Sequence, residues 1–147
     1  MTWAVVRVRG GIHARTPVVE TLRHLRLTRP NHAVVVRDDP VVAGMVYAVQ
    51  GYVTWGPVSP ETVELLVRAR GRTEDGKPVP EESSGEMARE VHARGIGSVE
   101  GLKPLFRLKA PTGGWGSTKK PYTHGGALGF RAAGSKLDMD ALLRRMI

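Results

Sequence analysis

Residues 3–9 read WAVVRVR and decide the fold, because apolar and other side chains alternate along them with a period of two. Alternate residues of a β-strand point to opposite faces of a sheet. Ala4 and Val6 therefore share one face, and Arg7 and Arg9 share the other. The pattern predicts a half-buried strand whose arginine face is the less covered one.

Helical and strand patterns alternate outward from this strand. A capping residue followed by proline, at residues 16–17 and again at 39–40, predicts the starts of two amphipathic helices. The β-branched run at 34–36 and the stretch 52–55 predict a second and a third strand. The order strand, helix, strand, helix, strand predicts an α+β core over residues 1–58, with helices on one face of the sheet and the other face uncovered.

The rest of the chain, residues 59–147, is predicted to be a helical and extended C-terminal extension. Only 5% of all residues are aromatic and 18 are glycine, so part of the chain is expected to lie outside a compact core. The predicted parts are a helix at 59–71, an acidic segment at 74–100, a basic glycine-rich arm at 101–131 and a C-terminal helix at 137–147.

Positive charge is concentrated at the two ends of the chain. The formal net charge is +8 and the isoelectric point is about 10.4. Residues 1–57 carry seven basic side chains against three acidic ones, residues 58–100 six against nine, and residues 101–147 nine against two. This distribution favours a polyanionic partner such as nucleic acid, and a solubilising surface charge is the alternative.

The arm has the composition of a nucleic-acid-binding segment. From Lys103 to Arg131 it contains six Lys or Arg residues, no acidic residue, and aromatic residues between glycines. Trp115 could stack on an unpaired base or cover the core as a hydrophobic lid, and the sequence leaves both open. Phe106 and Phe130 are expected in the core.

Other kinds of site fail on spacing. A P-loop needs glycine directly before the lysine, but Thr118 precedes Lys119, and Lys119 also occupies the third glycine position of a dinucleotide-binding loop. The chain has no cysteine, and its five histidines form no metal-binding pair. Asp38 and Asp39 are interpreted as a helix start, so no catalytic residue, metal or cofactor is predicted.

The hydropathy of the chain gives an expectation for its location. No stretch approaches the roughly 20 apolar residues that a membrane span needs, and arginines stand near the N-terminus where a signal peptide would be apolar. We expect a cytoplasmic protein with no membrane partner.

Several motifs together resemble one family. They are Gly44-Met45, YVTWG at 52–56, ETVELLVRARGR at 61–72, GKPV at 76–79 and GLKPLFRLKAPTGGWGSTKKPYTHGGALGFR at 101–131. Together they resemble the large-subunit ribosomal protein L-thirty family, called L-seven in eukaryotes, in its archaeal and eukaryotic form. The resemblance implies a ferredoxin-like core, a three-stranded antiparallel sheet in the order 3-1-2, seated on large-subunit rRNA and without catalytic activity.

The predicted function is that of a structural constituent of the large ribosomal subunit, which binds rRNA, helps its packing and assembly, and supports translation. The expected partners are 23S rRNA, with 5S rRNA as a further candidate, and neighbouring large-subunit proteins, with no small-molecule substrate. The alternative is a dissociable RNA-binding or RNA-modifying factor. The candidate RNA-binding residues are Arg7, Arg9, His13, Arg15, Arg23, Arg26, Arg29, Lys103, Arg107, Lys109, Trp115, Lys119, Lys120, His124 and Arg131.

Overall fold

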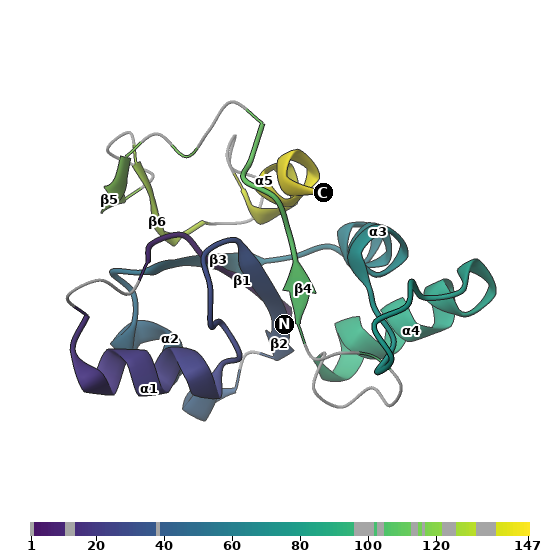
Figure 1. Cartoon of the computed structure of the whole chain (residues 1–147), viewed down its shortest axis with the longest axis horizontal. Helices are drawn as coiled ribbons and strands as arrows, with labels where there is room; N and C mark the ends of the chain where they lie inside the picture. The colour runs from purple at the N-terminus through teal and green to yellow at the C-terminus, as the bar shows by residue number, and fades with distance from the viewer. Residues whose placement is uncertain are drawn as a thin grey trace.

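The structure is a computed structural model of the chain. It describes residues 2–10, 14–37, 39–95, 102, 105–112, 115, 117–121, 126–131 and 138–147, with the backbone alone for 117–121. Within this part of the chain, five helices accompany one six-stranded sheet (Figure 1).

Three antiparallel strands form the centre of the sheet. β1 (Thr2–Arg7) lies between β2 (His32–Arg37) and β3 (Val53–Pro57), with Ala4 opposite both Val35 and Gly56. This confirms the α+β class and the predicted strand order 3-1-2.

The extension enlarges the sheet beyond the three predicted strands. β4 (Phe106–Arg107) pairs with β2 on one edge, while β6 (Gly126–Phe130) runs parallel to β3 on the other and is followed outward by β5 (Ser117–Pro121). The sheet order is therefore β4-β2-β1-β3-β6-β5. Both edges of the core sheet are paired with strands of the arm, which the alternation pattern of the first 58 residues did not reveal.

The central strand is buried on both faces, so the prediction of a half-buried strand is wrong. Ala4, Val5, Val6 and Arg7 are all buried. Successive residues of a strand point to opposite faces, so neither face of β1 is open.

Two helices cover one of these faces. α1 (Thr16–His24) and α2 (Pro40–Ala48) lie together below the strands in Figure 1 and bury Leu22 and Val46. Asp39 caps α2 as predicted, because its Oδ1 accepts a hydrogen bond from the Val41 N–H at 2.8 Å. Thr16 is not a cap. It is the first residue of α1 and follows the N-cap Arg15, whose side chain makes no capping hydrogen bond.

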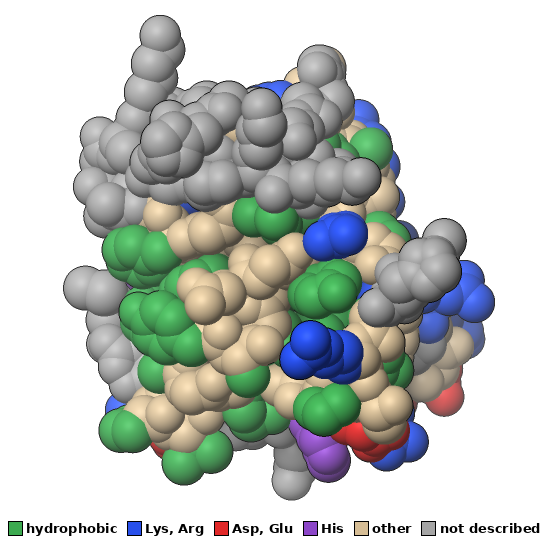
Figure 2. Space-filling view, turned by 90° about the vertical axis from the view of Figure 1, so that its left-hand side faces the viewer, with side chains coloured by type: hydrophobic (Ala, Val, Ile, Leu, Met, Phe, Trp, Pro, Cys, Tyr) green, Lys and Arg blue, Asp and Glu red, His purple; other side chains and the backbone are tan. Residues whose placement is uncertain are grey.

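The outer face of α2 is apolar as well. Val41 and Tyr47 are exposed there, and no charged residue lies between Pro40 and Ala48. Figure 2 looks onto the end of the molecule that is at the left in Figure 1, and shows hydrophobic side chains exposed over its middle with few Lys or Arg side chains among them. Positive charge is therefore sparse over the described part of this end.

The opposite face of the sheet is covered by the extension. α5 (Met139–Met146) lies above the strands in Figure 1 and buries Met139, Leu142, Leu143 and Met146. Asp138 caps it by accepting a hydrogen bond from the Ala141 N–H at 2.9 Å. The predicted uncovered face is therefore occupied by the chain itself, because a sheet with apolar residues on both faces must bury both.

Two further helices pack beside the sheet. α3 (Pro60–Arg70) follows its N-cap Ser59, and α4 (Glu81–Arg94) packs against it and against β2. α4 lies inside the predicted acidic segment, and the sequence analysis did not identify it as a helix. Its buried residues Ser84, Ala88 and Val91 have helical spacing.

One hydrophobic core joins the N-terminal residues to the extension. Val5, Val35, Leu66 and Leu143 belong to the same buried cluster. Packing is continuous across residue 58, so the structure does not mark a boundary there, and the division of the chain into a core and an extension stays a prediction.

A substitution at Gly56 tests how closely the extension packs against the sheet. A Cβ at this position would lie 2.1 Å from the backbone oxygen of Arg131 and 3.0 Å from Cγ of Met139. We expect Gly56→Ala to lower the free energy of unfolding by about 1–3 kcal/mol or more, because backbone must move to admit the methyl group. Urea denaturation followed by circular dichroism measures this change.

Gly44→Ala is the matched control. A Cβ at Gly44, within α2, meets nothing within 4 Å, so alanine is expected to stabilise the helix by up to about 1 kcal/mol. Equal unfolding free energies for the two variants would contradict the close seating of the extension on β3.

Candidate nucleic-acid interface

Arg7 is placed inside the protein and not on an open sheet face. Its side chain is 6% exposed, its Nη1 donates a hydrogen bond to the Leu27 carbonyl at 2.8 Å, and its Nε donates to the Arg9 carbonyl at 3.0 Å. Burial lowers the pKa of this guanidinium from its usual value, and nearby Tyr52 acts in the opposite direction. These contacts commit Arg7 to the packing of α1 on the sheet, in contrast to its predicted role.

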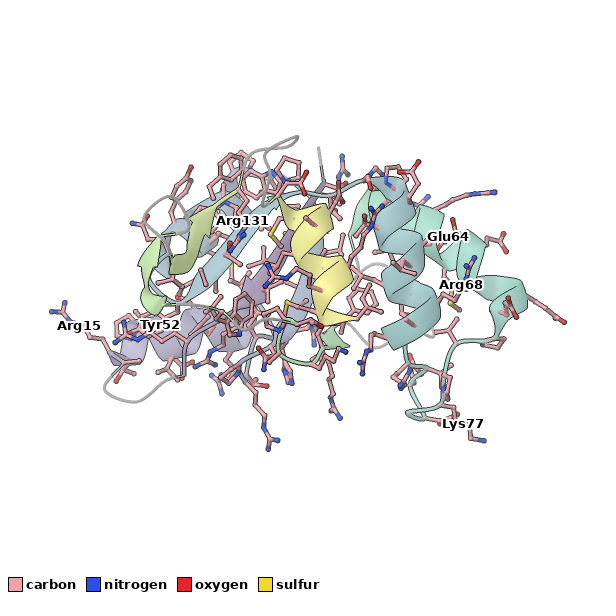
Figure 3. All side chains as sticks on the ribbon, turned by 90° about the horizontal axis from the view of Figure 1, so that it is seen from above. Arg15, Tyr52, Glu64, Arg68, Lys77 and Arg131 are labelled. Atoms are coloured by element: carbon pink, nitrogen blue, oxygen red, sulfur yellow. The ribbon has the colours of Figure 1, made fainter. Side chains whose placement is uncertain are left out.

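Arg131 is likewise a structural residue in this geometry. It is 4% exposed, its Nε donates to Oγ1 of Thr54 at 2.8 Å, and its Nη2 donates to the Ala127 carbonyl at 3.0 Å. Thr54 in turn donates to the Gly129 carbonyl at 2.8 Å. Figure 3 shows Arg131 over the strands, whereas Arg15 and Lys77 extend away from the molecule. Arg131 therefore joins β6 to β3.

Trp115 packs over a small hydrophobic cluster of the core. Its indole N–H donates to Oδ1 of Asn31 at 3.1 Å, and its ring packs against Val8, Ala127 and Leu128. Of the two interpretations left open by the sequence, this geometry matches the packing role.

The two phenylalanines of the arm differ. Phe106 is fully buried as expected, but Phe130 is 44% exposed, with its ring edge-on to Trp3 and tilted against Trp55. The expectation of a core position for Phe130 is wrong, because β6 is inserted near the sheet margin and leaves one side of the ring outside.

Four of the candidate arginines in the N-terminal half are exposed. Arg15, Arg23 and Arg26 lie on α1 or at its ends, and Arg29 lies in the turn before β2. Arg23 forms an ion pair with Glu20 of the same helix, while the other three have no ion-pair partner among the described residues. Arg9 is half-buried, with its guanidinium 5.2 Å from the centre of the Tyr52 ring.

The arm adds positive charge along the edge of the sheet. β4 places Arg107 directly opposite His32, and the Leu108 N–H donates to the Asn31 carbonyl at 3.1 Å. Arg107 and Lys109 are both exposed. We call Arg29, His32, Arg107 and Lys109 the edge cluster.

His32 is the half-buried member of the edge cluster. Its pKa is lowered from the usual 6.5, first by burial and then by the charges of Arg107, Arg29 and Arg7. Its Nδ1 is buried without a hydrogen-bond partner in the described part of the chain. Burial and these charges both disfavour the charged form of the ring, and the two exposed arginines, Arg29 and Arg107, are the members of this set that an anion could reach.

Two further arginines, which were not among the predicted binding residues, lie beside the edge cluster. Arg70 at the end of α3 and Arg72 just after it line a hollow of about 240 Å³ together with Gly76, Leu105 and Arg107. They were missed because segment 58–100 is acidic in total, which hid a local basic group at the end of a helix. The signal was present in the alternation of Arg68, Arg70 and Arg72.

Several predicted binding residues lie outside the described residues. These are His13, Lys103 and His124, and the side chains of Lys119 and Lys120, of which β5 gives the backbone alone.

The described residues offer little for a metal site or a membrane span. No group of three or more potential metal ligands occurs among the described residues. None of the described helices is long and apolar enough to span a membrane. Asp39 caps α2, and Asp140 accepts hydrogen bonds from the backbone N–H and the hydroxyl of Ser59, at 3.0 and 3.2 Å. These carboxylates therefore hold helix starts.

The sequence of this chain is similar to those of known proteins. Residues 3–53 match the family described as ribosomal protein L30p/L7e. The large ribosomal subunit protein uL30 of Methanopyrus kandleri is 41% identical over 95% of this chain and all of its own length, and that of Methanosphaera stadtmanae is 39% identical over 99% of each. The chain belongs to the L30p/L7e family. The uL30 protein of Methanococcus vannielii is a further relative, at 39% identity over 90% of this chain and 93% of its own length.

The arm lies outside the part of the chain that matches the family model, but inside the part that matches the archaeal relatives. The family model ends at residue 53, in β3, whereas the archaeal uL30 relatives extend over the arm as well. The edge cluster is built from both parts, since Arg29 and His32 come from the first and Arg107 and Lys109 from the second. The L30p/L7e core alone would therefore hold half of this cluster.

The low pKa of His32 predicts a pH dependence of stability. In the unfolded chain this histidine takes up a proton near its usual pKa of 6.5, while the folded protein resists protonation. Unfolding therefore takes up protons in the window below pH 6.5, and stability falls as the pH is lowered through it. We expect His32→Gln to reduce this slope, measured by urea denaturation at several pH values between 5 and 7.5.

His24→Gln serves as the control, because His24 is exposed on α1. It is expected to leave the wild-type slope unchanged. If His32→Gln shows the full wild-type slope between pH 5 and 6.5, His32 does not resist protonation in the folded protein.

Proposed function

We propose that this protein is a structural constituent of the large ribosomal subunit, which binds rRNA and helps its packing and assembly. The observation that carries the proposal is the edge cluster, where exposed Arg29, Arg107 and Lys109 have no carboxylate partner among the described residues. Unpaired arginine and lysine side chains along one edge suit a chain of phosphates, because each contact releases counterions from RNA.

The proposed RNA surface continues from the edge cluster onto α1. It includes Arg9, Arg15, Arg23 and Arg26, with Arg23 contributing less because Glu20 already neutralises it. Lys103, Lys119, Lys120, His13 and His124 are included on their sequence alone. Arg7, Arg131 and Trp115 are left out, since each is held by contacts within the chain.

The partners follow from the same proposal. The relatives are named large ribosomal subunit proteins, and by analogy the RNA is 23S rRNA, with 5S rRNA as a neighbouring candidate. Neighbouring large-subunit proteins are the other proposed partners, and the proposed location is the cytoplasmic ribosome. No reaction is proposed, because the cluster presents mainly exposed cations, and its one imidazole, half-buried His32, has no nucleophile or carboxylate partner among the described residues.

Sedimentation of a native cell extract tests the proposal. An antibody against the protein would locate it among free, small-subunit, large-subunit and whole-ribosome fractions of a sucrose gradient. We expect stoichiometric residence in the large-subunit and whole-ribosome fractions after a moderate salt wash, since many phosphate contacts must dissociate together. A protein found mainly free would instead be a dissociable RNA-binding factor.

Lys119 and Lys120 test the contribution of the arm. Replacing both with alanine is expected to weaken binding to large-subunit rRNA and to reduce the slope of log K against log salt by up to about two, because each phosphate contact contributes roughly 0.9. Arg89→Ala on the acidic helix α4 is the control and should leave the slope unchanged. An unaltered slope in the double variant would remove both lysines from the contact surface.

A further inference from the structure

The hollow between α3 and β4 is built by two segments that lie far apart in the sequence. Arg70 and Arg72 come from the end of α3, Gly76 from the turn that follows, and Leu105 and Arg107 from the arm. These segments converge because the residues after α3 fold back as a short hairpin, which also touches the start of the arm through a bridge between Thr73 and Leu102.

The hairpin holds its arginines in defined places. Arg72 pairs with Pro78, the Thr73 N–H donates to the Lys77 carbonyl at 2.8 Å, and the Gly76 N–H donates to the Thr73 carbonyl at 2.8 Å. Gly76 has a φ of +84°, which favours glycine. Nη1 of Arg72 donates to the Gly71 carbonyl at 2.9 Å, so this side chain is oriented before any ligand arrives.

None of the three guanidiniums around the hollow forms an ion pair in the described part of the chain. No described carboxylate forms an ion pair with Arg70, Arg72 or Arg107, although Glu74 and Asp75 lie in the same hairpin and are exposed. Arg68 differs, since it pairs with Glu64 at 2.8 Å, and Figure 3 shows both on α3. Arg70 and Arg72 are half-buried, which strengthens their attraction for an anion.

The size of the hollow limits what can fill it. At about 240 Å³ it is smaller than the pockets of roughly 300–1,000 Å³ that hold small-molecule ligands, but it can hold a phosphate group with part of a sugar against Leu105. The planar fork of a guanidinium matches the oxygens of a phosphate in pairs of hydrogen bonds. The hollow also continues from the edge cluster, because Arg107 belongs to both.

We propose that Arg70, Arg72 and Arg107 form a seat for one phosphate group of an RNA backbone. The seat fixes the register of the strand that runs along the edge cluster, since a phosphate enclosed on three sides restrains sliding more than an open contact does. This inference rests on the proposed RNA-binding function and adds a specific site to it. Free inorganic phosphate would offer the same chemistry, and the test separates the two sources.

The first test measures RNA affinity and its salt dependence. The full-length protein would be titrated against a purified large-subunit rRNA transcript at several salt concentrations. We expect the double variant R70Q/R72Q to bind about tenfold more weakly, with a slope reduced by about one, as the loss of one phosphate contact requires. E64Q/R68Q removes an ion pair from the same helix and should change neither quantity.

A conservative variant separates recognition from folding. Arg70→Lys keeps the charge but loses the planar fork, so we expect weaker binding with an unaltered salt slope and unaltered thermal stability. Wild-type binding by both R70Q/R72Q and Arg70→Lys would overturn the phosphate seat while leaving the proposed function intact. Failure of the wild-type protein itself to bind the transcript would overturn the proposed function.

The second test identifies the source of the phosphate. The arginine side-chain N–H resonances of the labelled protein would be followed by nuclear magnetic resonance, first with inorganic phosphate and then with a uridine hexanucleotide. We expect Arg70, Arg72 and Arg107 to shift together at lower phosphate-group concentration with the oligonucleotide, since the edge cluster contributes to its binding. Equal or stronger saturation by inorganic phosphate would overturn RNA as the ligand of this seat.

Discussion

The burial of β1 on both faces is the constraint on which the rest of the structure depends. The face that carries Val5 and Arg7 lies against α1 and the loop after it, where Arg7 reaches the Leu27 carbonyl. The other face carries Ala4, which pairs with Gly56 of β3. On this face the extension lies over the two strands, with Arg131 and Met139 next to Gly56. With no face left open, contact with a partner falls to edges, turns and exposed helix surfaces, and the edge cluster lies on such an edge.

The sequence predicted the order of the first five elements because each begins and ends at a local signal. Asp39 and Pro40 act within one helical turn and start α2 where it was expected, whereas α1 begins at the expected place without the expected cap. The burial of Arg7 could not be predicted from such local signals. Alternation distinguishes the two faces of a strand, but it does not reveal that residues 126–131 and 139–146, more than a hundred positions away, cover the second one.

The candidate site shows the same limit. The composition of the chain shows where positive charge is dense, and several side chains in those segments are exposed: Arg15, Arg26, Arg29, Arg107 and Lys109. Composition did not separate a surface from an interior position for Arg131 and Trp115, because a cation or an indole with a local polar partner can also lie in the interior. It also did not single out Arg70 and Arg72. Their importance comes from the fold of a hairpin beside β4, and that proximity is encoded in long-range contacts.

The position of α5 has a consequence for the order of events during biosynthesis. Its buried residues reach the sheet after every strand has been made, so a nascent chain that already contains β1, β2 and β3 still exposes the apolar surface that α5 will cover. Synthesis from Pro57 to Met139 takes roughly 4–16 s at about 5–20 residues per second. Throughout that interval the incomplete chain exposes apolar surface, which favours aggregation until α5 covers it.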